Sequence, residues 1–147
     1  MEYIQGSQGR IFVARLDDGD DIFEELKKIV KKENIKAGFI HFLGASSGSK
    51  AVLGPEKRNY PPSPIWWEFD DVRELIGLGI VAWEGNEPKI HIHAGIGHSS
   101  EAKVGCVREK AKVYLTVEAV IQEIVAPELG RKFDDKYNAS LLSFSAK

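Results

Sequence analysis

Three of the four histidines of this 147-residue chain lie close together, in the segment IHIHAGIGH that runs from Ile90 to His98. His91 and His93 are separated by one residue in a stretch that alternates apolar and polar side chains. On a β-strand they would point to the same face, with Cα atoms about 6.5 Å apart. Two imidazoles at that spacing can bind one metal ion, and zinc would require a third and usually a fourth N, S or O ligand. The same spacing also occurs on an ordinary polar sheet face, so both interpretations stay open.

Further side chains could complete such a site, and each has a structural alternative. Cys106, the one cysteine, could donate a thiolate, but a lone thiol also packs as a small hydrophobic group. Glu118 falls on the polar side of an alternating segment, where it could bind metal, orient an imidazole or simply face solvent. His98 falls in a predicted loop that could fold back toward the pair. The predicted metal ligands are therefore His91 and His93, with help from Glu118 or Cys106, and zinc is the candidate ion.

Catalysis has less support than binding in this sequence. A zinc hydrolase needs an open coordination position, a general base and a cradle for an oxyanion or phosphate. The segment Gly44–Gly48 lacks the lysine of a phosphate-binding loop, and Ser46 and Ser47 have no nucleophile-elbow context. We therefore assign no catalytic residue, and an enzyme is the less favoured interpretation.

The elements that would carry these residues are mostly strands. Residues 21–33 place apolar side chains at helical spacing, with acidic residues in the first turn and lysines in the second half, which predicts an amphipathic helix. The rest predicts an α/β fold of the α+β type, a mainly antiparallel sheet of about six to eight strands with one main helix after the first strand. The expected strands are 9–16, 37–43, 72–83, 89–97, 113–125 and a final edge strand at 141–144. Between them we expect a bend at 44–49, a proline-containing loop at 54–64 and irregular structure at 127–138.

Strand alternation also predicts where individual side chains point. Trp66 and Trp67 are adjacent, so one ring should enter the core while the other lies on the surface. In the segment 113–125, alternation places Leu115 on the same face as Val113 and Val117.

Composition indicates a single globular domain over residues 1–147. A net charge of −2 gives no general attraction to polyanions, so direct binding to nucleic acid is not expected. No apolar run approaches the roughly 20 residues that span a bilayer, and no signal-type segment begins the chain, so no membrane association is expected. One cysteine cannot form an internal disulfide, and the expected location is the reducing cytoplasm.

The order of several segments resembles a known family. Gly9-Arg10 opens the first strand, an acid-capped helix follows, and three further segments come in a fixed order. They read GFIHFLGASSG (Gly38–Gly48), HIHAGIG (His91–Gly97) and VEAVIQEI (Val117–Ile124). Together they resemble the plants-and-prokaryotes-conserved (PPC) domain in its stand-alone prokaryotic form, over nearly the whole chain. The resemblance implies an α/β fold with a largely antiparallel sheet, and it implies a homotrimer.

The resemblance also has implications for metal binding by the histidines and for DNA binding. Some prokaryotic relatives place a metal at such a histidine pair and complete it with a histidine from a Gly-Gly-His segment. The matching segment here is Gly105-Cys106-Val107, so the resemblance carries over only His91 and His93 as ligands. Plant members carry an AT-hook, a short Arg-Gly-Arg-Pro core, and this chain contains no such core.

These observations predict a homotrimeric binding or assembly module that could act in regulation through a protein partner or a small ligand. The first alternative is a metal-dependent or small-molecule-binding protein, with a histidine-based site on the sheet or at a subunit interface. The second alternative, a DNA-associated protein, rests on family analogy alone.

Overall fold

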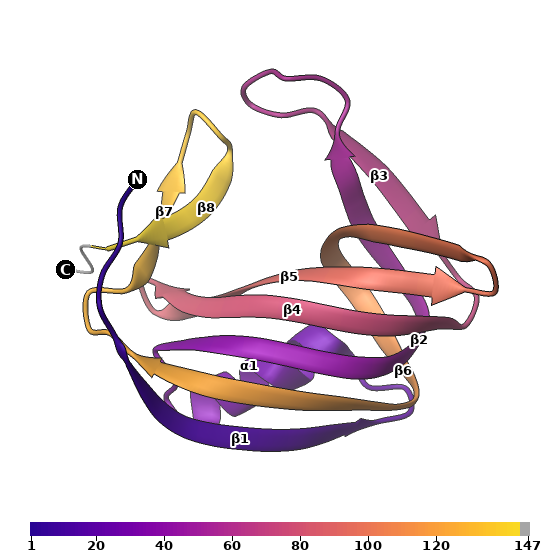
Figure 1. The fold of residues 1–147 in the computed structure, drawn as a ribbon, viewed down its shortest axis with the longest axis horizontal. Helices are drawn as coiled ribbons and strands as arrows, with labels where there is room; N and C mark the ends of the chain where they lie inside the picture. The colour runs from indigo at the N-terminus through magenta and orange to yellow at the C-terminus, as the bar shows by residue number, and fades with distance from the viewer. Residues whose placement is uncertain (145–147) are drawn as a thin grey trace.

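The computed structural model describes residues 1–144, with the backbone alone for Glu109. Eight strands and one helix make up most of this part of the chain (Figure 1). This confirms the predicted fold class, a mainly antiparallel sheet with one main helix after the first strand. No helix among residues 1–144 is long and apolar enough to cross a membrane. In chain order the elements are β1 (Ser7–Asp17), α1 (Ile22–Lys32), β2 (Ala37–Pro55), β3 (Pro64–Phe69), β4 (Arg73–Glu84), β5 (Glu87–His98), β6 (Glu101–Val125), β7 (Gly130–Asp134) and β8 (Ala139–Ser143).

Six of the strands form one antiparallel sheet in the order β1-β6-β5-β4-β2-β3, and β7 and β8 form a separate hairpin. The long strands β2 and β6 also pair with each other, so β2, β4, β5 and β6 form a closed ring of neighbours. The sheet is therefore strongly curved and has an inner and an outer face. The helix lies on one side of the sheet, and its apolar side chains join the core cluster of the inner face (Figure 1).

The helix forms where its apolar pattern predicts it. The Asp21 carboxylate accepts hydrogen bonds from the backbone N–H groups of Phe23 and Glu24, at 2.9 and 3.1 Å, and so satisfies two donors of the first turn. Acidic side chains in the first turn and lysines in the last complement the helix dipole. The apolar stripe packs against the sheet and is buried; its members are Ile22, Phe23, Leu26 and Val30.

The predicted bend at 44–49 is wrong, because β2 runs through this segment as one strand. Register shifts between Gly44 and Ala51 let β2 turn with the curved sheet while it keeps its pairing with β6. Gly44 has φ +146°, and a Cβ there would overlap the Thr116 carbonyl oxygen. The small residues that indicated a bend therefore mark bulges inside a long strand, and the predicted loop is confirmed for 56–63.

Two other segments also differ from the expectation. Residues 130–134, predicted as irregular, form β7 and pair with β8, so the final strand belongs to a separate hairpin. The strand expected at 113–125 begins at Glu101. Within it Leu115 has φ +59° and is 68% exposed, so a bulge turns it away from the buried face of Val113 and Val117.

The tryptophan pair follows the predicted alternation. Trp67 packs against the core cluster, whereas Trp66 is 50% exposed on the opposite face of β3.

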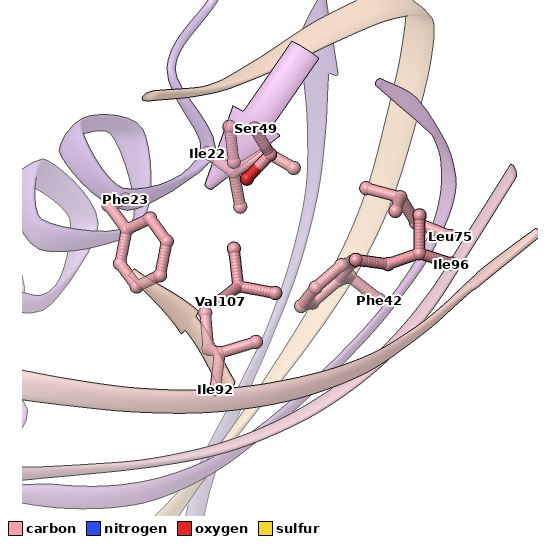
Figure 2. A pocket seen from close by; sticks show the side chains of 9 residues that line it. Ile22, Phe23, Phe42, Ser49, Leu75, Ile92, Ile96 and Val107 are labelled. Carbon is pink, nitrogen blue, oxygen red and sulfur yellow. The ribbon is translucent and has the colours of Figure 1, made fainter. Parts of the chain in front are cut away.

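A very small cavity lies in the interior of the described part of the chain. It lies between the start of α1 and the inner face of the sheet, has a volume of about 10 Å³, and is lined by apolar side chains and Ser49 (Figure 2). The buried Ser49 hydroxyl has no hydrogen-bond partner among the described residues. A space of this size holds one water molecule at most, so it cannot admit a small-molecule ligand.

Gly77 is a packing constraint on the inner face. The aromatic ring of Phe42, which is only 4% exposed, lies directly over it, and a Cβ at this position would overlap the ring. We predict that Gly77→Ala lowers the free energy of unfolding by about 1–3 kcal/mol, because a close-packed ring must move. Urea denaturation would measure this change.

Gly95→Ala is the matched control. A Cβ at Gly95 would meet only the Ile76 carbonyl oxygen, at 3.9 Å, an ordinary contact. The control should stay within about 0.5 kcal/mol of the parent protein. Equal stabilities for the two variants would contradict the packing role of Gly77.

Candidate metal site on the outer face of the sheet

The pairing of β5 with the first part of β6 sets the geometry of the candidate site. A turn at Ser99 and Ser100 joins the two strands, and the register then places His93 directly opposite Cys106. The next pair along β5 and β6 is Ile92 with Val107, both buried on the inner face. Alternation therefore points His91, His93 and Cys106 to the outer face.

The three side chains lie close enough to share one ion. One ligand atom from each of His91, His93 and Cys106 can be chosen so that all three lie within 4.8 Å of one another. The two imidazole rings have centroids 5.0 Å apart and are nearly perpendicular. Both histidines are exposed, whereas Cys106 is 5% exposed beside the paired strand β2. The site thus has a buried thiol at its base and two imidazoles open to solvent.

The surroundings of His91 keep its imidazole neutral. Its pKa is lowered from 6.5 to about 4, chiefly because surrounding protein atoms remove water, although the residue retains exposed surface. The positive charges of Arg131 and Arg108, and the neighbouring His93, lower the pKa further. At neutral pH the ring is therefore uncharged and has a nitrogen lone pair available to a metal.

Cys106 is protonated more firmly than an ordinary thiol. Burial raises its pKa, and the nearby positive charge of Arg108 opposes that shift in part. Because metals bind the thiolate, a bound ion would displace this proton.

Two arginines lie beside the cluster, from different parts of the chain. Arg108 follows Val107, the last β6 residue that pairs with β5, lies two residues after Cys106, and is exposed. Arg131 comes from β7, where its Nη1 donates a hydrogen bond to the Ser140 carbonyl oxygen at 2.7 Å. The Ser140 hydroxyl in turn donates to a carboxylate oxygen of Glu84 at 3.0 Å, which ties the hairpin to the end of β4.

The other predicted candidates lie outside this cluster. Glu118 is exposed and sits opposite Arg15 on β1, twelve positions along β6 from Cys106. His98 lies 3.8 Å from the Asp71 carboxylate, which places it near the start of β4. His41, the remaining histidine, is exposed on the outer face beside the ring of Phe39.

Sequence reasoning missed the two arginines. A signal for Arg108 existed: a two-residue turn at Ser99 and Ser100 pairs His98 with Glu101, and counting back along both strands pairs Ile92 with Val107, the residue before Arg108. Arg131 carried no comparable signal, because its position depends on how a separate hairpin packs against β4.

The donor set suits zinc. A tetrahedral zinc ion with bonds of about 2.0–2.3 Å holds its ligand atoms about 3.4 Å apart, which small side-chain rotations could reach from the present separation. Two imidazole nitrogens and one thiolate form a borderline-soft set that favours zinc over magnesium or calcium. Three protein ligands leave a fourth position, as in zinc sites that accept an outside ligand.

The same face carries an apolar surface next to the cluster. Val13 on β1 and His41 on β2 both pair with Val120 of β6. His41 also pairs with Leu78 on β4, and Leu78 pairs with His93 on β5. Several exposed aliphatic side chains on one face are unusual on an isolated domain. We call five side chains the outer apolar patch, each more than half exposed: Val13, Leu43, Ile76, Leu78 and Val104.

Comparison with solved structures shows the same fold in other proteins. A metal-containing protein from Archaeoglobus fulgidus matches with a TM-score of 0.83 and 20% identity, over 96% of this chain and 98% of that one. A plant- and prokaryote-conserved (PPC) protein from Pyrococcus horikoshii gives 0.82 and 23%, over 100% and 98%. A suspected DNA-binding protein from Bacteroides thetaiotaomicron gives 0.80 and 17%, over 95% and 97%. At these identities the likeness shows the fold alone.

The comparison by sequence identifies the family. No curated protein matches this chain. The sequence model of the Plants and Prokaryotes Conserved (PCC) domain matches residues 3–125, which include His91, His93 and Cys106. The chain therefore belongs to the PCC domain family.

Proposed function

We propose that this protein binds a zinc-type metal ion through His91, His93 and Cys106. The observation that carries the proposal is the convergence of two imidazoles and one thiol within 4.8 Å on adjacent strands. The neutral state of His91 at physiological pH supports it, because a protonated imidazole cannot bind metal. A protein of the same fold, from Archaeoglobus fulgidus, contains metal, which adds support by analogy.

Each ligand would have a distinct part in holding the ion. His91 and His93 reach it from β5, and Cys106 supplies negative charge from the buried base of the site. When bound, zinc would supply a Lewis-acidic centre with one position open to a further ligand. The arrangement fits a binding or sensing module, and no general base is assigned.

The metal content of the protein tests this proposal. We expect about one zinc per chain after zinc addition and removal of unbound ion, measured by mass spectrometry on protein without a histidine tag. The double variant His91→Ala/His93→Ala should lose the zinc, and Cys106→Ser should weaken binding by at least tenfold, because a neutral hydroxyl is a poor zinc ligand.

His98→Ala is the control, since His98 is exposed and lies outside the cluster. It should retain the metal. Parent protein that binds no zinc, or a double variant that binds as much as the parent, would contradict the proposal.

A second function, self-assembly, is supported by the outer apolar patch. Five aliphatic side chains that are each more than half exposed would be costly to leave in water and are suited to a subunit contact. The patch adjoins His93 through Leu78, so an assembled neighbour would lie beside the metal ligands. We propose a homotrimer, and the number of subunits rests on the resemblance to the PPC domain.

Disruption of the patch tests this assembly. We expect the parent protein to sediment at about three times the 16.4 kDa chain mass in analytical ultracentrifugation. Leu78→Lys should shift it toward the monomer, because a buried lysine without a partner disfavours the contact. Val72→Lys, at a 40% exposed position outside the patch, should leave the mass unchanged. A monomeric parent protein at micromolar concentration would contradict the proposal.

A DNA-associated function has weaker support. It is suggested by the Bacteroides thetaiotaomicron protein of the same fold and by the family analogy. The chain has 20 lysines and arginines against 22 acidic residues, and this balance gives little of the attraction to phosphate that such binding needs.

A further inference from the structure

We propose that the metal site takes a small oxyanion, a carboxylate or a phosphate-type group, as its outside ligand, and that Arg108 and Arg131 help to bind it. The inference rests on the proposed metal site and specifies what occupies the remaining coordination position. It depends on the placement of two guanidinium groups that the metal ligands themselves do not require.

Arg108 lies next to the site. It follows Val107, the last β6 residue paired with β5, and stands two residues from Cys106; its positive charge acts on the pKa of both His91 and Cys106, so its side chain is near these ligands. The residue is exposed, and no salt bridge involves it among the described side chains. Its guanidinium is therefore available to an anion from solution.

Arg131 reaches the same region from the hairpin and is incompletely paired. Its Nη1 donates to the Ser140 carbonyl oxygen, but its Nε, which is shielded from water, has no partner among the described residues. Glu84 is the nearby acid that partly offsets its charge. A shielded guanidinium with an unused donor is held at an energetic cost, and a bound oxyanion close by would reduce that cost.

Charge balance favours an anion once a metal is bound. A divalent ion and two guanidiniums meet one thiolate and the Glu84 carboxylate, and both imidazoles are neutral ligands, so positive charge is left uncompensated. This excess disfavours a lone metal ion and favours a metal with an anion. The two ligands should therefore strengthen each other's binding, and thermodynamic linkage requires the effect to be equal in both directions.

The side-chain chemistry defines the class of anion. Guanidinium presents paired N–H donors whose spacing matches two oxygens of a carboxylate or phosphate group. The open position on zinc accepts an oxygen ligand. An anion could place one oxygen on the metal and direct its other oxygens toward the Arg108 guanidinium. A neutral ligand would leave the guanidinium charge unpaired.

Cobalt substitution gives a direct test on the full chain. Co²⁺ replaces zinc in thiolate sites and produces a sulfur-to-cobalt absorption band together with visible bands that depend on the remaining ligand. Cobalt-loaded protein is titrated with acetate and separately with sulfate, a soluble tetrahedral probe. Sodium perchlorate keeps the ionic strength constant. We expect acetate or sulfate to change the visible bands and to tighten cobalt binding.

Three variants separate the contributions. Arg108→Gln should keep the sulfur-to-cobalt band but weaken the anion effect on the order of tenfold, the usual effect of losing a charge-assisted hydrogen bond. Arg131→Gln retains a donor for the Ser140 carbonyl and should show a smaller loss. Arg58→Gln, in the exposed loop before β3, is the control and should behave as the parent protein.

The outcomes are distinguishable from failure of the metal site itself. A cobalt band that neither anion alters would overturn the oxyanion inference and leave the metal site intact. An anion effect of equal size in Arg108→Gln and the parent protein would also overturn it. Absence of any sulfur-to-cobalt band in the parent protein would overturn both proposals. A response to acetate alone or sulfate alone supports the inference and selects between carboxylate and phosphate-type ligands.

Discussion

The antiparallel register between β5 and the first part of β6 is the constraint on which the site depends. It brings His93 opposite Cys106 and Ile92 opposite Val107, across a turn of only two residues. Strand side chains alternate, so a slip of one residue would turn Cys106 inward and expose Val107 in its place. The site therefore exists only while this register is maintained.

The inner face of the sheet maintains it. Ile92 and Val107 are paired in the same register and are buried with the helix side chains, so a slip would also remove apolar area from the core. Gly77 and Phe42 add a second restraint, because the ring fits only over a residue without a side chain. The inner face thus holds the strands in place, and the outer face presents His91, His93, Cys106 and the outer apolar patch.

The sequence was informative where a local pattern decides the structure. The helix and the shared face of His91 and His93 follow from spacing alone. The long strand β6 was recognised only in its second half, because Gly105, Cys106 and Val107 are buried in succession between β5 and β2 and so show no alternation. Arg131 could not be placed, because packing of the hairpin against β4 depends on the tertiary structure rather than on any local pattern.

The central claim is that Cys106 and the two histidines bind the same metal ion. X-ray absorption fine structure at the zinc edge, on protein loaded with one equivalent of zinc, tests it most directly. We expect one sulfur at about 2.3 Å together with at least two nitrogens at about 2.0 Å, and loss of the sulfur in Cys106→Ser. A coordination shell of nitrogen and oxygen alone in the parent protein would contradict it.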